Sequence, residues 1–305
     1  MGSKCLTPCL SATVVVVDFF EVFNAMQIIT RIIEMQSLAE SLRTQGRTIG
    51  FVPTMGFLHE GHLSLMRRAR QESDAVVASI FVNPTQFGPQ EDFERYPRDE
   101  EGDRRKCESA GVDILFMPNA AEMYPEKPSV FVTVEGISDI LEGAIRPGHF
   151  RGVATVVMKL FNIVKPHKAF FGQKDYQQCA VIKRMVKGLN LDVEVVALPT
   201  VREHDGLAMS SRNSYLSPDE RRIAAVIHSA LASAEQMVKA GVGEPEKLKN
   251  KMLAILREEP GVVVDYVEVA DPESLAPLAI VKGRAVILTA VRLGRTRLID
   301  NILIS

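Results

Sequence analysis

The residues with the clearest chemical potential are His59 and His62, two imidazoles that flank Gly61. A helical pattern begins at about Leu63, so the pair lies at the mouth of a helix, where side chains three positions apart can point the same way. The free N–H groups and the positive dipole end of a helix start attract anions, and glycine lets a backbone approach its ligand closely. These residues predict a cradle for a polyphosphate; two surface histidines in a loop are the alternative.

A second group of polar residues lies in Phe171-Gly-Gln-Lys-Asp175, which joins a strand-like run to a helical one. Lys174 can place a charge on a phosphate, and Asp175 can accept a hydrogen bond from a ribose or hold an amine. The alternative is a plain turn in which Asp175 caps the helix.

A third group is Met209-Ser-Ser-Arg-Asn213. Two hydroxyls and a guanidinium in sequence suit a pyrophosphate leaving group, because they can stabilise charge that develops in a transition state. A polar turn before Pro218 is the alternative.

These segments need elements that bring them together. The apolar run at residues 48–52 is typical of a buried strand, which Pro53 and Gly56 break into a turn. Similar runs at residues 75–82, 113–117, 168–172 and 193–198 alternate with helical patterns at residues 63–72, 100–110, 154–164 and 175–188. This order predicts an α/β fold with a Rossmann-like, doubly wound parallel sheet, whose ligands bind beyond the carboxyl ends of the strands.

The pattern changes after about residue 200. Pro218 opens a helix to about Ala240, a second helix covers residues 246–258, and strand-like runs at 262–269, 285–291 and 296–300 predict a small second sheet. We therefore expect a nucleotide-binding domain at residues 26–200 and a smaller C-terminal α/β domain at residues 201–305 that closes over the nucleotide site. The polar stretch 88–98 has the composition of a mobile loop, either a solvated connector or a gate over the site.

The composition excludes several classes of partner. A formal net charge of −2 and the absence of Trp give no footprint for nucleic acid. Cys5, Cys9, Cys107 and Cys179 form neither a disulfide framework nor a C-x-x-C zinc pair. We expect Cys107 and Cys179 to be ordinary buried thiols, in a reducing, cytoplasmic setting.

Taken in order, the polar segments resemble one family. Pro53-Thr-Met-Gly-x-Leu-His-x-Gly-His62 is similar to the signature of the HIGH-type nucleotidyltransferases, which activate a group by attack on the α-phosphate of ATP, and among these to the pantoate–β-alanine ligases. Segments 79–87, 95–98, 141–143, 146–152, 171–175, 209–213 and 297–301 match the same family in order. The resemblance runs from about Met26 to the C-terminus.

The resemblance implies an ATP site and a catalytic set. The ATP contacts would be Met55, Gly56, Phe57, Leu58, His59, Glu60, Gly61, His62, Gly172, Gln173, Lys174, Asp175, Val201, Met209, Ser210, Ser211 and Arg212. Val201 would meet the adenine through its backbone, and the catalytic residues would be His59, His62, Lys174, Ser210, Ser211 and Arg212.

It also implies a pocket for the acid. Pantoate would be bound by the amides of Gln86 and Gln178, because an amide can donate to and accept from hydroxyls. Its other contacts would be Pro53, Thr54, Asn83, Arg146 and His149, with Arg151 in the same basic loop. Mg²⁺ would enter with ATP and be held through the phosphates, with Asp92, beside Glu91, as its carboxylate.

The implied reaction has two steps. The pantoate carboxylate attacks the α-phosphate, giving pantoyl adenylate and pyrophosphate, and the β-alanine amine then attacks the acyl carbon, giving pantothenate and AMP. His62 would act either as a phosphate ligand or as a proton donor. The family forms homodimers, so we expect one here, with ATP, pantoate and β-alanine as its small-molecule partners.

Two other functions compete with this one. A nucleotidylyltransferase would leave AMP on a phosphate-bearing acceptor, but Gln86 and Gln178 stand in place of a clamp for such a phosphate. A non-catalytic nucleotide sensor would keep the fold, but the intact His59, His62 and Lys174 argue against it.

The N-terminus precedes the resemblance. Its apolar stretch at residues 12–23 is too short to span a bilayer and is interrupted by Asp18 and Glu21. Lys4 is its one basic residue, and no clear small-residue cleavage site follows. We expect residues 1–25 to be an extension outside the enzyme fold, with no role at a membrane; a cryptic targeting segment is the alternative.

Overall fold

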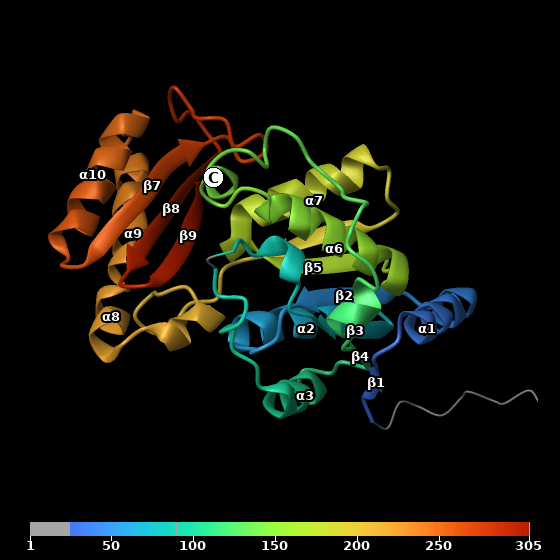
Figure 1. Cartoon of the computed structure of the whole chain (residues 1–305). Helices are drawn as coiled ribbons and strands as arrows, with labels where there is room; N and C mark the ends of the chain where they lie inside the picture. The colour runs from blue at the N-terminus through green and yellow to red at the C-terminus, as the bar shows by residue number, and fades with distance from the viewer. Residues whose placement is uncertain (1–24, 90, 305) are drawn as a thin grey trace, which may run out of the picture.

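Figure 1 shows a computed structural model of the chain, which describes residues 25–89 and 91–304. All but the last residue of the expected extension, residues 1–25, lie outside the described residues, as do Cys5 and Cys9. Within the described part, no helix is long and apolar enough to cross a membrane.

The first part of the chain forms a six-stranded parallel sheet with strand order β1-β4-β3-β2-β5-β6. Its elements are β1 (Gln27–Ile29), α1 (Ile32–Thr44), β2 (Ile49–Thr54), α2 (Glu60–Glu72), β3 (Ala75–Ile80), the 3-10 turn η1 (Pro84–Gln86), α3 (Glu100–Ser109), β4 (Ile114–Phe116), α4 (Ala120–Met123), α5 (Glu142–Ile145), α6 (His149–Val164), β5 (Lys168–Gly172), the 3-10 turn η2 (Gln173–Asp175), α7 (Tyr176–Gly188) and β6 (Glu194–Leu198). The predicted doubly wound parallel sheet is confirmed.

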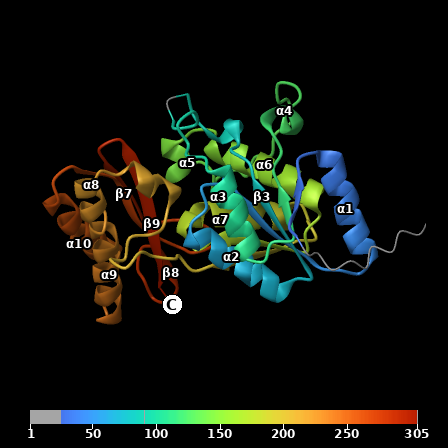
Figure 2. The ribbon, with the colours of Figure 1, turned by 90° about the horizontal axis from the view of Figure 1, so that it is seen from below.

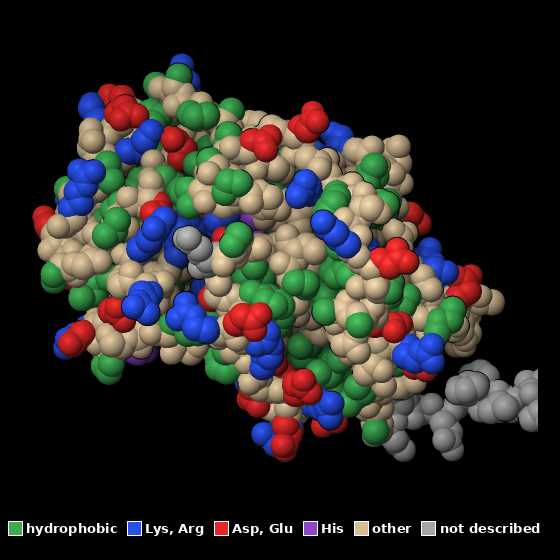
Figure 3. Space-filling view, in the orientation of Figure 1, with side chains coloured by type: hydrophobic (Ala, Val, Ile, Leu, Met, Phe, Trp, Pro, Cys, Tyr) green, Lys and Arg blue, Asp and Glu red, His purple; other side chains and the backbone are tan. Residues whose placement is uncertain are grey.

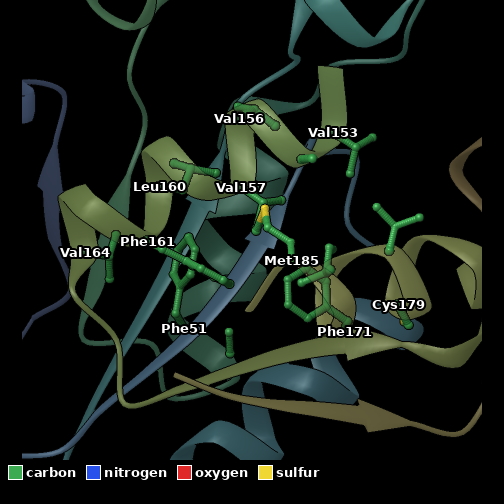
Figure 4. Packing of buried hydrophobic residues seen from close by; sticks show 14 of the residues in the cluster. Phe51, Val153, Val156, Val157, Leu160, Phe161, Val164, Phe171, Cys179 and Met185 are labelled. Atoms are coloured by element: carbon green, nitrogen blue, oxygen red, sulfur yellow. The ribbon is translucent and has the colours of Figure 1, made fainter. Parts of the chain in front are cut away.

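Helices cover both faces of this sheet, which is why its strands are apolar almost throughout. Successive side chains of a strand point to opposite faces, so Phe51 and Phe171 meet α1, α6 and α7, whereas Val52 and Phe170 meet α2 and α3. Figure 4 shows α6 lying across Phe51, whose ring contacts that of Phe161 edge to face with centroids 6.5 Å apart.

The strand order reverses at β2. The chain proceeds from β2 to β3 and β4 on one side, and β5 and β6 lie on the other. Strand β2 pairs with β3 along its whole length but with β5 only at Gly50 and Phe51. A crevice therefore opens between the carboxyl ends of β2 and β5, at the switch point where such sheets bind ligands.

The turn expected to begin at Pro53 begins later in the structure. Pro53 lies inside β2, opposite Ser79 of β3, and the strand continues to Thr54. A proline cannot donate a backbone hydrogen bond, and it is tolerated here because β2 has already parted from β5 on its other side.

The rest of the chain forms a smaller antiparallel sheet with strand order β7-β8-β9. Its elements are the 3-10 turn η3 (Ser211–Tyr215), α8 (Pro218–Ile223), α9 (Val226–Lys239), α10 (Pro245–Glu258), β7 (Val262–Ala270), β8 (Ala285–Leu293) and β9 (Thr296–Ile304). Helices α9 and α10 bury Leu231, Leu248 and Met252 in one cluster with this sheet. Figure 2 shows the small sheet and its helices beside the parallel sheet.

Several predicted boundaries shift. The helix expected from Pro218 to about Ala240 is two helices, because the backbone tightens at Ala224 and Ala225, where the N–H of Ile227 bonds the carbonyl of Ala224. Helix α2 begins at Glu60 rather than Leu63, and α6 at His149 rather than Ala154. The first turn of each helix contains polar residues, so the apolar periodicity used to predict the helices begins only after it. Helix α1 was not predicted.

Candidate active site

Two cavities meet at the switch point. An inner cavity of about 210 Å³ is lined by residues from the ends of β2 and β5, from η1 and α6, and from the segment after β6. An outer cleft of about 780 Å³ runs from there to the β8–β9 turn. The two share Arg146, His149, Lys174, Asp175, Gln178 and Arg212 in their walls.

The turn after β2 is held by a residue of another element. Gly56 and Phe57 both have positive φ, 84° and 51°, and the N–H groups of Phe57 and Leu58 donate to the two carboxylate oxygens of Asp103, each at 2.7 Å. Asp103, on α3, is 1% exposed, and burial raises its pKa although both N–H donors lower it. The sequence did not predict a role for Asp103, because an Asp near the start of a helix is usually a simple helix cap.

The two histidine rings lie against each other at the start of α2, tilted by 41°, with centroids 4.1 Å apart. Gly61 makes this possible, since a Cβ there would lie 2.9 Å from the His59 ring. The His59 N–H donates to His62 Nδ1 at 3.3 Å, so a neutral His62 carries its proton on Nε2. Burial is the main cause that lowers the pKa of His59 to about 4 and that of His62 well below its ordinary value. Both rings are therefore neutral at physiological pH.

Lys174 lies in η2, directly after β5, and its Nζ is 3.3 Å from Asp175 Oδ1. Both side chains reach both cavities. The charge of Lys174 is also one of the causes that lower the pKa values of His59 and His62, which indicates that the three lie in one electrostatic environment. The turn and the histidine pair thus face the same space, as the sequence predicts.

The segment with two serines closes the other side. Ser211 Oγ donates to the carbonyl of Phe57 at 3.2 Å, which ties this segment to the turn after β2. Arg212 makes two hydrogen bonds to the carboxylate of Asp92, at 3.0 and 2.9 Å. Ser210 accepts from the Arg212 N–H and lines neither cavity.

The amide of Gln86 has a fixed orientation. Tyr124 Oη donates to Asn83 Oδ1 at 2.9 Å, so Asn83 Nδ2 is the donor to Gln86 Oε1, at 3.1 Å. Gln86 keeps its Nε2 donor, which among the described residues contacts only Met55 Sδ. Asn83 and Gln86 are 1% and 8% exposed and line the inner cavity, so the site presents a buried donor there.

The second amide lies on α7. Gln178 lines both cavities, and no described residue hydrogen-bonds its side chain. Its neighbour Gln177 is buried and bonds the carbonyls of Ile137 and Ile140 and the N–H of Glu142. Gln177 also borders the outer cleft, but its amide is used within the fold, whereas the amide of Gln178 faces both cavities.

The basic residues Arg146, His149 and Arg151 do not all face the site. Arg146 pairs with Glu91 and its Nη1 lies 3.2 Å from His149 Nε2, while His149 Nδ1 lies 2.9 Å from the carbonyl of Gln86. Both ring nitrogens of His149 are thus used by the protein, and burial lowers its pKa to about 4. Arg151 points elsewhere and lies over the Phe131 ring at 4.6 Å.

Basic side chains outnumber acidic ones in the lining of the outer cleft. Figure 3 shows Lys and Arg side chains gathered on this part of the surface. Arg95, Arg292, Arg295 and Arg297 add to the arginines shared with the inner cavity. Arg297 of β9 binds the carboxylate of Glu142 on α5, so segments 141–143 and 297–301 meet across the cleft. Such a cleft suits a polyanion.

Most of the remaining expected contacts line the inner cavity: Pro53, Thr54, Met55, Gly61, Gly172, Val201 and Met209. Gly56, Phe57, Leu58, Glu60 and Gln173 line neither cavity. The Glu60 side chain is exposed and pairs with Arg67. No group of three or more His, Cys, Asp or Glu that could hold a metal occurs among the described residues. Cys107 and Cys179 are buried free thiols, as predicted.

Comparison with known proteins identifies the family. The profile of the family described as pantoate–β-alanine ligase matches residues 27–303. The chain belongs to the pantoate–β-alanine ligase family. It is 52% identical over 279 residues to the pantothenate synthetase of Acetivibrio thermocellus, covering 92% of this chain and 99% of that protein. It is 55% identical over 276 residues to that of Thermotoga petrophila, covering 90% and 99%.

Solved structures agree. The pantothenate synthetase of Thermus thermophilus superposes with a TM-score of 0.86 at 48% identity, over 91% of this chain and 99% of that one. The pantoate–β-alanine ligase of Francisella tularensis, complexed with β,γ-ATP and β-alanine, has a TM-score of 0.77 at 38% identity, over 92% and 98%. The chain is therefore an ATP-binding ligase that joins pantoate to β-alanine.

Proposed function

We propose that this ligase makes pantoyl adenylate in the inner cavity and then transfers the pantoyl group to β-alanine. The observation that carries the proposal is the convergence of the histidine pair, the Lys174 turn, Arg212 and the two amides on one space at the sheet's switch point. A carboxylate is a poor acyl donor, so the mixed anhydride with AMP supplies the leaving group that an amide synthesis needs.

The basic residues would act in the first step. As the pantoate oxygen attacks the α-phosphorus, negative charge accumulates on the departing pyrophosphate. The neutral Nε2–H of His62, the Lys174 ammonium and the Arg212 guanidinium are donors fixed before the reaction, which is when such groups stabilise a transition state best. His59 would complete this set, while Ser211 would hold the Phe57 turn and Ser210 would hold the backbone of Arg212.

The amides would select the acid. Gln86 offers its Nε2 donor and Gln178 both a donor and an acceptor, which suits a carboxylate flanked by hydroxyls. In the second step the β-alanine amine attacks the acyl carbon and AMP leaves. Catalysis would come from positioning two bound reactants, since the site shows no nucleophile activated by a base.

Mg²⁺ would enter as part of the MgATP substrate. Both oxygens of Asp92 accept from Arg212, so this carboxylate could help hold the ion only if the triphosphate takes its place on the guanidinium. The exchange is electrostatically balanced, because each cation keeps an anionic partner.

We further propose a division into residues 26–200, which bind nucleotide and acid, and residues 201–305, which close over the ATP site. Membership in the family supports a homodimer, and the unpaired buried thiols fit a cytoplasmic setting. Analytical ultracentrifugation of the full chain tests this. A sedimenting species with the mass of a monomer at micromolar concentration would contradict the homodimer.

A pyrophosphate-release assay with a panel of acids and amines tests the reaction. We expect release that depends on pantoate, and AMP that appears free only when β-alanine is added. AMP retained on a phosphate-bearing product would indicate a nucleotidylyltransferase, and ATP binding without pyrophosphate release would indicate a sensor.

A further inference from the structure

Asn301 of β9 reaches out of the small sheet and holds the Lys174 turn. Its side-chain Nδ2 donates to the carbonyls of Gln173 and Lys174, each at 2.9 Å, and its Oδ1 accepts from Gln173 Nε2 at 3.3 Å. Asn301 is 2% exposed, so these bonds form away from water. Both donors of the amide are used on the backbone of one catalytic turn.

The preceding residue holds a second wall of the site. Asp300 receives two hydrogen bonds from Arg202, at 2.6 and 3.0 Å, and Arg202 also donates to the carbonyl of Gly206 at 3.0 Å. Arg202 bridges to Ala208, and the Met209 N–H bonds the carbonyl of Val201. The segment from Val201 to Met209 is thereby fastened to β9.

We propose that Asn301 is a positioning residue for the first step of the reaction. It fixes the η2 backbone so that the Lys174 ammonium points into the cavity, while Asp300 fixes the neighbouring wall. Among the described residues the Lys174 ammonium itself bonds only Asp175, so the position of this side chain depends on the η2 backbone that carries it. The small sheet therefore contributes geometry to the site. This inference rests on the proposed role of Lys174.

The decisive variant is Asn301→Asp. It keeps the shape of the side chain and the acceptor for Gln173, but it replaces the two-donor group with an oxygen that faces two carbonyl oxygens. The turn should shift, and displacement of a catalytic group by about 1 Å can cost about 10²-fold in rate.

The measurement separates the two steps. Quenched single turnovers with ATP and pantoate alone should show adenylate formation slowed by about 10- to 100-fold. The rate at which β-alanine consumes adenylate already formed on the enzyme should stay within about twofold, because Lys174 serves the pyrophosphate.

Two comparisons exclude a merely structural effect. Thr289→Val removes a buried hydrogen bond to Tyr266 in the same sheet, so it should lower the melting temperature while both steps keep their rates. In a Lys174→Ala background, adding Asn301→Asp should slow adenylate formation by less than about twofold, because the two residues act as one unit.

The outcomes are distinct. Normal adenylate formation by Asn301→Asp, or effects of Asn301→Asp and Lys174→Ala that simply multiply, would overturn this inference alone. A wild-type chain that makes no adenylate would overturn the proposed function instead. Should Asn301→Asp not fold, Asn301→Ser, which keeps one donor, is judged by the same two rates.

Discussion

At the residue scale, His62 takes its chemical state from one backbone group. The His59 N–H occupies Nδ1, which leaves Nε2–H as a neutral donor, and burial keeps the ring unprotonated at physiological pH. A neutral imidazole is a good hydrogen-bond donor to phosphate and a weak acid. This state favours the role of phosphate ligand over that of proton donor.

His62→Ala should therefore slow adenylate formation while the fold stays intact. Loss of one donor to developing charge costs about 10²–10³ in rate. His62→Gln, whose amide N–H lies near the place of Nε2, should recover part of that loss. The test is a single-turnover quench with ATP and pantoate, with circular dichroism on each variant. Equal rates of adenylate formation for the Gln and Ala variants would support proton donation by His62. A defect confined to the β-alanine step would show that His62 does not bind the triphosphate.

The adjacent glutamines of α7 make a matched pair. Gln178→Ala should weaken pantoate binding by about 1–3 kcal/mol and leave ATP binding unchanged, because an unpaired polar partner in a closed site is costly. Calorimetric titration of each ligand measures this. Gln177→Ala is the control: it strips three backbone groups of their partner, so it should lower the free energy of unfolding. Equal losses for both ligands in Gln178→Ala would count against its assignment.

At the element scale, α3 holds the turn after β2 from outside. Asp103 takes both N–H groups of a turn whose two positive-φ residues, Gly56 and Phe57, would otherwise be held weakly. Lys106, one turn further along α3, donates to the carbonyl of Leu58 at 2.9 Å. One helix thus satisfies three backbone groups of the turn.

Asp103→Ala should destabilise the fold and weaken ATP binding together. Each unsatisfied N–H costs about 1–3 kcal/mol, and the freed turn no longer presents the histidines in place. Urea unfolding and ATP titration measure the two effects. Asp99→Ala serves as the control, since Asp99 caps the same helix through Gly102 but does not touch the turn. A loss of stability without any loss of ATP affinity would show that the turn after β2 keeps its conformation without Asp103.

At the scale of the whole molecule, the buried histidines make stability depend on pH. An unfolded chain protonates them below about pH 6.5, whereas burial holds the pKa values of His59 and His149 at about 4 in the fold. The unfolded state binds more protons in that window, so stability is complete above about pH 6.5 and falls as the pH approaches 4, by about 1 kcal/mol per pH unit for each histidine near pH 5.

Urea unfolding between about pH 7.5 and 5 checks this dependence. His149→Gln keeps a hydrogen-bonding side chain but cannot titrate, so its stability should fall less steeply than that of the wild-type chain. Identical slopes for the two would mean that carboxylates govern the acid limit.

A second prediction at this scale concerns residues 1–25. The family match begins at residue 27, and the β1 strand that starts there already pairs with β4. A chain that begins at Met26 should therefore keep its melting temperature and its activity. Both are compared directly with those of the full chain, and loss of either in the shorter chain would give the extension a role in the enzyme.

The sequence by itself determined the type and order of most elements, α1, α4 and α5 excepted, and the segments that carry chemistry. Strands buried on both faces must be apolar throughout, and a glycine turn before a helix start is a local signal, so β2, β3 and β5 and the histidine pair could be predicted from neighbouring residues. The βαβ order predicted that the ligand segments follow the carboxyl ends of parallel strands, but the pairing of β2 with β5 at the switch point came only from the structure.

Only the tertiary structure decided which polar residues are used to hold the fold and which face the cavities. Gln177 and Gln178 have the same side chain, and Asp103 and Asn301 lie far along the chain from the turns that they fix. His149 reads as a ligand until both its nitrogens are seen to be used. Hydrogen-bond partners brought together across 30 or more residues leave no periodic trace in sequence, so these roles are properties of the packed molecule.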